Sequence, residues 1–311
     1  MSKSKDKSFK TSIGGQALIE GVMMRGPKKS AMAVRKPNGE LQVDVWDNPP
    51  RTIWNRIPVV RGVVNMVTSL VDGYKCLMKS AEISTEGLEE EEPSKFEKWL
   101  EEKLGDKMTK VVTAVSAVLG FGIAILLFMF LPSFLVGLFN GILPRWGMSL
   151  VEGLLKIALF IGYLALVSLM PDMKRLFQYH GAEHKTIFCY EAGQELTVEN
   201  IRSQSRFHPR CGTSFLLIAL VLGILVFSVV TWSNPVIRTL LKLAMMPIVV
   251  GFAYELIKLA GRYDNLFTRI ISFPGLKLQH LTTREPDDSM IEAAIASMKP
   301  VLPEQKGEDQ W

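Results

Sequence analysis

The stretch that decides the fold is residues 111–144, VVTAVSAVLGFGIAILLFMFLPSFLVGLFNGILP, in which 34 consecutive positions contain no Asp, Glu, Lys, Arg or His. A helix needs about 20 apolar residues to cross a bilayer, so this stretch predicts a transmembrane segment. Three further stretches are almost free of charge and predict the remaining spans: 154–171, 211–237 and 240–259. We therefore expect four transmembrane helices, two within 109–171 and two within 214–260.

The composition excludes several classes of protein. The chain has 311 residues, of which 48% are hydrophobic and 22% charged, and its mean hydropathy is +0.19, so it is neither disordered nor typical of a soluble enzyme. A net charge of +5 is too small for a dedicated nucleic-acid binder, and membrane lipids are the expected partner. A second copy of the chain or another membrane protein stays open as a further partner. The three cysteines favour a reducing compartment over a disulfide framework.

The distribution of Lys and Arg predicts the orientation in the membrane. Basic residues precede the first span at 95–110 and fill the loop between the second and third spans at 174–210, whereas the opposite loops carry little beyond Arg145 and Arg238. Because positive loops resist translocation, both termini and the central loop are expected in the cytoplasm. Residues 1–10 lack the apolar core of a cleaved secretory signal. The chain is thus predicted to be a multi-pass protein of the cell membrane.

The polar parts of the chain predict a small α+β cytosolic portion. Alternating apolar residues indicate strands over 16–24, 31–35 and 41–46, and Asn38-Gly39 is typical of a hairpin turn, so we expect an antiparallel sheet. Residues 59–81 predict an amphipathic helix that either packs on this sheet, which we favour, or lies at the membrane interface. The regions outside the spans are then a cytosolic sheet and helix at 1–85, a charged spacer helix at 86–108, a cytosolic loop at 172–213 and a cytosolic tail with a short helix at 261–311.

The main functional signal is a cluster of histidines in the central loop. Three of the four histidines of the chain fall within 29 residues: His180, His184 and His208. In Tyr179-His-Gly-Ala-Glu-His184 two imidazoles are four residues apart, about 40° of rotation on a helix, so both can face one ion. The pattern His-x-x-Glu-His is the inverted zinc-hydrolase motif, in which the Glu, here Glu183, acts as general base on the bound water.

A second segment completes the candidate ligand set. His208-Pro-Arg-Cys211 adds an imidazole and a thiolate, and His180, His184, His208 and Cys211 together match a tetrahedral divalent ion, with zinc the expected metal. If all four bind, the site is closed and structural; if one does not, an open position can hold an activated water. A chance pattern is the alternative, because the motif is short and Gly181 weakens a helix by about 1 kcal/mol relative to Ala.

Two other motifs are dense in glycine or in charge. Gly14–Pro27 lacks the Lys of a phosphate-binding loop and is no dinucleotide fingerprint, so a tight structural strand pair is favoured, with support of a metal site or contact with a polar ligand as alternatives. The segment Leu281–Asp288 contains Arg284 and Glu285, for which the sequence predicts no role.

Several motifs in one order resemble the YqhQ-like family of bacterial membrane proteins, over about residues 11 to 300. The matching segments are Gly14–Pro27, Phe177–Thr186, Leu196–Asn200, His208–Ser214 and Leu281–Asp288. The resemblance implies a location in the bacterial cell membrane and a general expectation of a metal-dependent enzyme, in a family whose function is unknown.

Three functions follow from these observations. The leading hypothesis is a membrane protein whose cytosolic portion binds a divalent metal and which, as an enzyme, would be a hydrolase with Glu183 as general base. The second is a non-enzymatic scaffold or assembly factor held together by a closed zinc site. The third is a transporter, which the small number of polar residues in the predicted spans disfavours.

Overall fold

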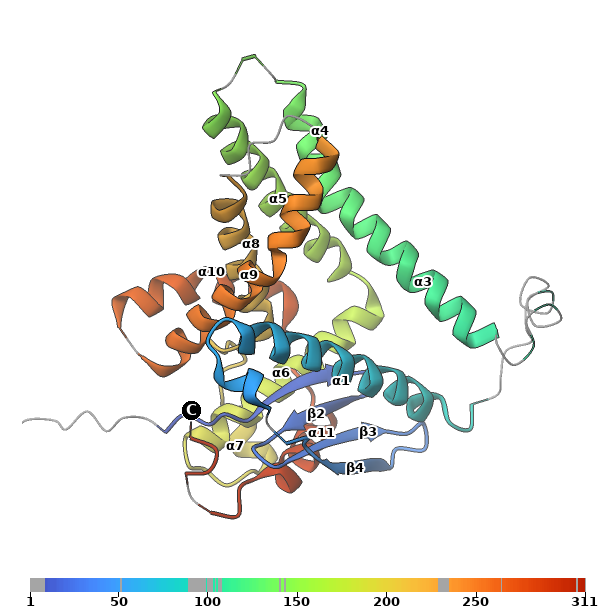
Figure 1. The fold of residues 1–311 in the computed structure, drawn as a ribbon. Coiled ribbons are helices and arrows are strands. Elements are labelled where there is room, and N and C mark those ends of the chain that lie inside the picture. Colours follow the sequence, from blue (N-terminus) through green and yellow to red (C-terminus); the bar gives the residue numbers. More distant parts are fainter. Residues whose placement is uncertain are drawn as a thin grey trace, which may run out of the picture. The chain divides into compact units, whose positions relative to one another are not determined.

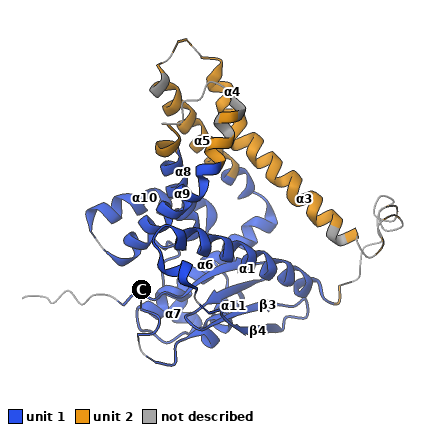
Figure 2. Cartoon of the chain, viewed as in Figure 1, with its two compact units in different colours: residues 1–86, 164–223, 244–311 blue, residues 87–163, 224–243 orange. Residues whose placement is uncertain are grey.

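The computed structural model describes residues 9–50, 52–88, 99, 103, 105, 108–139, 141–142, 144–228, 235–263, 265–305 and 307–310. The chain divides into two compact units, coloured separately in Figure 2. Unit 1 comprises residues 1–86, 164–223 and 244–311, and unit 2 comprises residues 87–163 and 224–243. Unit 1 contains the sheet and all the residues of the candidate metal site.

The sheet of unit 1 has four antiparallel strands in the order β1-β2-β3-β4 (Figure 1). These are β1 (Gly14–Leu18), β2 (Gly21–Arg25), β3 (Lys29–Arg35) and β4 (Leu41–Asp47). The predicted sheet is confirmed, and Gly39 has the positive φ, +88°, that its hairpin turn requires. The tight strand pair favoured for Gly14–Pro27 is formed by β1 and β2. The run 16–24 is therefore not one strand, because Leu18 pairs with Gly21 and Glu20 adopts a φ of +53°, which turns the chain after only five residues.

Helices cover both faces of the sheet. Helices α6 (Pro171–Glu191) and α11 (Asp288–Met298) pack on one face, and α1 (Val60–Thr85) packs on the other. Because side chains alternate along a strand, β2 sends Val22 and Met24 toward α6 and α11 and Met23 toward α1. The helix predicted over 59–81 therefore packs on the sheet, which was the favoured of its two predicted positions.

The remaining helices of the described residues belong to the same two units. The longer ones are α3 (Met108–Ile125), its π-helical continuation η3 (Leu126–Phe130), α4 (Leu131–Gly137), α5 (Arg145–Val167), α8 (Gly212–Ser228), α9 (Pro235–Arg262) and α10 (Leu266–Thr282). The short ones are η1 (Ile53–Arg56), α7 (Val198–Arg202) and η4 (Lys299–Val301). The region 261–311 thus contains α10 in addition to the one short helix predicted there. Most of the predicted spacer helix at 86–108 lies outside the described residues.

Three helical segments in the described residues are long and apolar enough to cross a membrane: Val111–Gly137, Gly147–Val167 and Leu240–Arg262. The prediction of four is corrected to three. The span expected at 211–237 corresponds to α8, which has 17 residues and a length of about 26 Å, less than the roughly 30 Å of a bilayer core. Residues 229–234 of that expected span lie outside the described residues.

Unit 2 buries a cluster of charged side chains between its apolar helices. The Oε1 atom of Glu152 accepts hydrogen bonds from Lys156 Nζ at 2.7 Å, from Lys242 Nζ at 2.7 Å and from Ser133 Oγ at 2.8 Å. Glu152 and both lysines are less than one-tenth exposed. One carboxylate therefore faces two ammonium groups in an apolar surrounding.

Candidate metal centre

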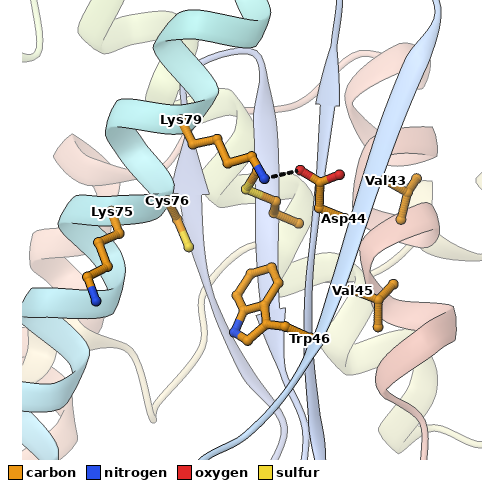
Figure 3. A pocket seen from close by; sticks show the side chains of 8 residues that line it. Val43, Asp44, Val45, Trp46, Lys75, Cys76 and Lys79 are labelled. Carbon is orange, nitrogen blue, oxygen red and sulfur yellow. Dashed lines mark ion pairs between the residues drawn. The ribbon is translucent and has the colours of Figure 1, made fainter.

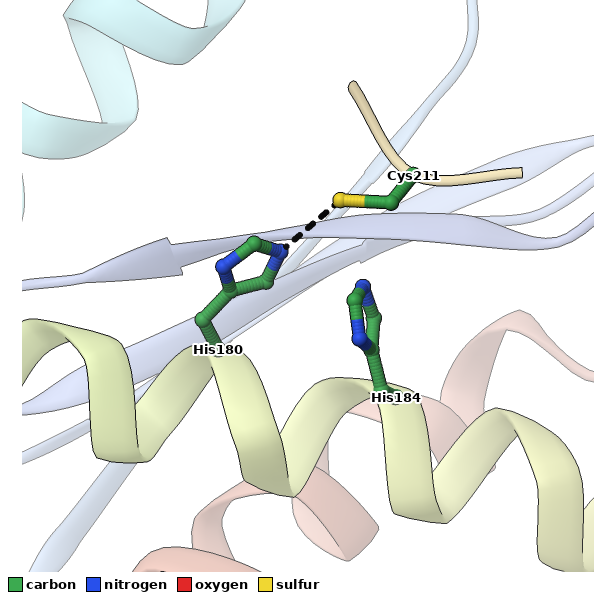
Figure 4. Close-up of side chains that lie close together, drawn as sticks. All are labelled: His180, His184 and Cys211. Carbon is green, nitrogen blue, oxygen red and sulfur yellow. Dashed lines mark hydrogen bonds between the residues drawn. The ribbon is translucent and has the colours of Figure 1, made fainter. Parts of the chain in front are cut away.

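Helix α6 brings the first two candidate ligands together. The helix begins with Pro171 in its first turn, a position where proline needs no hydrogen-bond partner, and it runs without interruption through the His-x-x-Glu-His motif. The rings of His180 and His184 lie one turn apart with their centroids separated by 4.4 Å, and both project from the same side of the helix (Figure 4). Helix α6 therefore brings the two imidazoles together, as their spacing in the sequence predicts.

Backbone carbonyls hold both imidazoles in one tautomer. His180 Nδ1 lies 2.8 Å from the carbonyl oxygen of Thr282, and His184 Nδ1 lies 2.6 Å from that of Arg206. A carbonyl can only accept a hydrogen bond, so each Nδ1 carries a proton, and Nε2 is the nitrogen that has the lone pair when the ring is neutral. Metal-binding histidines in proteins are commonly oriented in this way. Both Nε2 atoms are therefore candidate ligand atoms.

Cys211 supplies the third ligand atom, immediately before α8. Its Sγ atom lies 3.3 Å from His180 Nε2 and accepts a hydrogen bond from the backbone N–H of Thr213 at 3.4 Å (Figure 4). The ligand atoms of His180, His184 and Cys211 all lie within 4.8 Å of one another. Zinc–nitrogen and zinc–sulfur bonds of about 2.0 and 2.3 Å in a tetrahedron separate ligands by about 3.3–3.7 Å, so the three atoms fit one zinc ion with little movement.

The charges of this group favour a thiolate. Burial opposes ionisation of Cys211, but the neighbouring His180 and His184 outweigh it and hold the thiol pKa well below its ordinary value. Burial likewise lowers the pKa of His180, yet the sulfur of Cys211 and the carboxyl of Glu183 raise it to about 9. Since the thiolate is the form of cysteine that binds metals, the site is electrostatically suited to a cation.

The structure does not bring His208 into this group. Its ring centroid is 5.5 Å from that of His184, but its Nε2 lies 3.1 Å from Arg210 Nη2 and 3.9 Å from a carboxylate oxygen of Glu191. Burial lowers the pKa of His208 to about 4, which keeps the ring neutral. The side chain of Gln279 holds the backbone at His208 through two hydrogen bonds of 2.7 Å, one donated and one accepted.

Glu183 lies beside the three ligand atoms and is buried. One carboxylate oxygen is 3.9 Å from His180 Nε2, and the backbone N–H of Gly15 donates a hydrogen bond to the carboxyl. Burial raises the pKa of Glu183 above its ordinary value. Gly15 must be glycine for this approach, because a Cβ there would lie 2.8 Å from Glu183 Cγ and 2.7 Å from the carbonyl oxygen of Met23. The Gly14–Pro27 motif therefore supports the site.

A small cavity opens onto this group. It has a volume of about 110 Å³, and Gly15, Glu183, His180, His184 and Cys211 are among the residues that line it. A larger hollow of about 500 Å³ lies between α1 and β4, where Lys79 pairs with Asp44 at 2.8 Å near Trp46 and Cys76 (Figure 3). None of the predicted site residues lines that hollow.

The segment Leu281–Asp288 is a strap across α6. The backbone N–H of Arg284 donates to the carbonyl of Phe177 at 2.8 Å, and the carboxylate of Glu285 pairs with Lys185 at 2.7 Å and with Arg206 at 3.2 Å. These contacts place the Thr282 carbonyl, which holds His180, next to the helix. The motif that had no predicted role thus positions a candidate ligand, His180.

We expect Gly181→Ala to destabilise the protein although alanine is the better helix former. A Cβ at this position would lie 2.0 Å from the carbonyl oxygen of Arg284, in the strap. Overpacking against backbone costs about 1–3 kcal/mol, which exceeds the gain of about 1 kcal/mol in helix propensity. The unfolding midpoint of the detergent-solubilised protein measures this. The control is Gly162→Ala in α5, where an added Cβ meets no described atom within 4 Å; an equal effect of both changes would contradict the prediction.

Comparison with known proteins gives one family and one relative. Residues 57–304 match a family described as "Protein of unknown function (DUF1385)". The chain is 36% identical over 295 residues to "Uncharacterized protein YqhQ" of Bacillus subtilis (strain 168), a match that covers 93% of this chain and 92% of that protein. No solved structure shows a significant match.

Proposed function

The chain belongs to the DUF1385 family of proteins of unknown function, and from the geometry of its candidate metal site we propose that it is a zinc-dependent hydrolase anchored in the cell membrane. The observation that carries the proposal is the group of His180, His184 and Cys211, with a buried carboxyl, Glu183, beside it. Catalytic zinc sites characteristically have three protein ligands and keep one position open.

Two features support an open site over a closed one. His208, the fourth predicted ligand, is turned toward Glu191 and Arg210. The cavity of about 110 Å³ at the ligand atoms leaves space for a water molecule, which occupies about 30 Å³, and for a small reacting group. A substrate could therefore reach an ion bound to the other three side chains.

The residues around the ion have separate tasks. Zinc, when bound, supplies an activated water at neutral pH and polarises a carbonyl or phosphoryl oxygen. Glu183 is the proposed general base, since its carboxylate lies beside the ligand atoms, 3.9 Å from His180 Nε2, and burial raises its pKa above the ordinary value. The N–H of Gly15 holds that carboxyl in place, and the carbonyls of Thr282 and Arg206 hold the two imidazoles.

The membrane part of the proposal rests on the three apolar helices and on the basic loops. We infer a multi-pass protein with both termini and the metal site on the cytoplasmic side, as the positions of Lys and Arg predict. The substrate is then accessible from the cytoplasm or from the inner leaflet.

A structural zinc site remains the second candidate, because the His208 ring is near enough to His184 to become a fourth ligand after a side-chain rotation. In that case the site is closed and the protein is a scaffold.

Zinc content separates the two candidates. We expect the wild-type protein, purified in detergent, to contain one zinc per chain by mass spectrometry, and His184→Ala and Cys211→Ser to lose it. His208→Ala retains zinc if the site is open and loses it if His208 is a ligand. A wild-type protein that takes up no zinc, or a Cys211→Ser protein that keeps it fully, would refute the proposed site.

A further inference from the structure

Helix α10 has its apolar side chains on the outside. Leu266, Phe267, Ile270 and Phe273 follow one another at helical spacing and are 75%, 59%, 63% and 58% exposed. These four residues are called the outer stripe below. A helix on a soluble surface turns such residues inward, so an exposed stripe of this kind marks a surface that is covered by something apolar.

The inner face of α10 consists of small or polar residues together with one buried leucine, Leu278. Thr268, Ser272, Gly275 and Gln279 are buried, and a Cβ on Gly275 would lie 2.4 Å from Ser214 Oγ, so the helix packs closely through this face. These contacts fix the orientation of α10 and keep the outer stripe exposed.

Positive charge accompanies the outer stripe. Arg262, Arg269 and Lys277 are exposed, and residues 265–284 contain no Asp or Glu. Lys277 Nζ lies 5.5 Å from the centroid of the Phe273 ring, and the Arg262 guanidinium lies 5.8 Å from that of Tyr263. Cations beside aromatic rings at the edge of an apolar stripe are typical of helices that lie on anionic membranes.

We propose that α10 lies in the plane of an anionic bilayer, with the outer stripe among the acyl chains and its basic residues at the lipid phosphates. The helix begins four residues after Arg262, where the last apolar segment, Leu240–Arg262, ends. A chain that leaves the membrane there reaches the headgroups as α10 starts. Each basic residue near an anionic surface contributes about 1 kcal/mol.

This placement brings the candidate site to the lipid surface. The last turns of α10 contain Gln279, which holds the backbone at His208, and Thr282, whose carbonyl holds His180. The position of α10 can be tested without any hydrolytic activity and does not depend on the proposed hydrolysis.

The test uses the full chain in lipid nanodiscs with an environment-sensitive fluorophore on a single introduced cysteine. The native cysteines are buried, and wild-type protein taken through the same labelling gives the background to subtract from Ile270→Cys. Phe273→Cys is a second reporter in case the first variant folds poorly. The matched control is Val45→Cys on β4, an apolar residue that is 48% exposed. We expect a blue-shifted emission that brominated lipids quench at 270 and 273, and quenching by aqueous iodide alone at 45.

Two results would overturn the proposal. A label at 270 and 273 that iodide quenches as fully as at 45 would place α10 in water. A label that neither quencher reaches would show that a protein surface, such as a second copy of the chain, covers the stripe.

The charge requirement is tested by the double change Arg269→Gln and Lys277→Gln. We expect quenching by brominated lipid at 270 to fall in nanodiscs containing phosphatidylglycerol and to stay unchanged in nanodiscs of phosphatidylcholine alone. If the double change left quenching at 270 unaltered in nanodiscs containing phosphatidylglycerol, the anionic preference would be refuted.

Discussion

Replacing Glu183 by glutamine is expected to lower hydrolysis about 10²–10⁴-fold while the zinc content stays at the wild-type value. Glutamine keeps the size of the side chain and the contact with the Gly15 N–H, but it cannot accept a proton from water. The measurement is turnover of a panel of chromogenic esters and phosphoesters, first screened with the zinc-loaded wild-type protein, together with metal analysis of the same samples.

The control for this change is Glu292→Gln on α11. Glu292 is a surface carboxylate paired with Arg35 at 2.9 Å, and exposed pairs of this kind contribute only about 0–1 kcal/mol. Turnover of that variant should match the wild type. If Glu183→Gln retained full turnover, Glu183 would not be the base; if it lost zinc, Glu183 would be a ligand.

The second large effect is expected at the buried charges of unit 2. Glu152→Ala removes the carboxylate shared by Lys156 and Lys242 and leaves two buried ammonium groups without it. Breaking a buried ion pair on one side costs about 3–5 kcal/mol, because the remaining charge stays desolvated. The unfolding midpoint in detergent should fall accordingly. Ser133→Ala, which removes only a neutral donor to the same oxygen, should cost about 0.5–1.5 kcal/mol.

A triple variant separates lost charge balance from lost packing. Replacing Glu152, Lys156 and Lys242 together by methionine removes all three charges and keeps apolar volume, and such replacements are often neutral or stabilising. Recovery of the midpoint in the triple variant is expected. A Glu152→Ala protein within about 1 kcal/mol of the wild type would contradict this account of the cluster.

Local patterns predicted the parts of the fold that local interactions determine. Asn38-Gly39 was identified because a hairpin turn needs a residue with positive φ, and α1 because its apolar residues repeat at helical spacing. A strand pair was favoured for Gly14–Pro27, but the position of its turn at Glu20 escaped prediction, since glutamate rarely adopts a φ of +53°. Helix α10 escaped because Pro274 interrupts its sequence and its apolar residues face outward. Its conformation depends on contacts with residues far away in the chain.

In the candidate site, too, local spacing was predictable and contacts with distant residues were not. The spacing of His180 and His184 on one helix was sufficient to predict that their rings meet. His208 could not be assigned in this way, because its environment is made by Glu191 on another element and by Gln279, 71 residues later. The carbonyls of Thr282 and Arg206 have no sequence signature at all, since every residue carries one.

The three separate stretches of unit 1 have a consequence for biosynthesis. The strands are complete at Asp47, but α11, which covers β2 and β3, begins at Asp288. At about 5–20 residues per second, the ribosome needs roughly 10–50 s to translate the chain between these points. Throughout that interval the nascent sheet lacks one of its covering helices. Premature termination before α11 would therefore release a polypeptide in which Val22 and Met24 lack part of their cover, a substrate for chaperones and proteases.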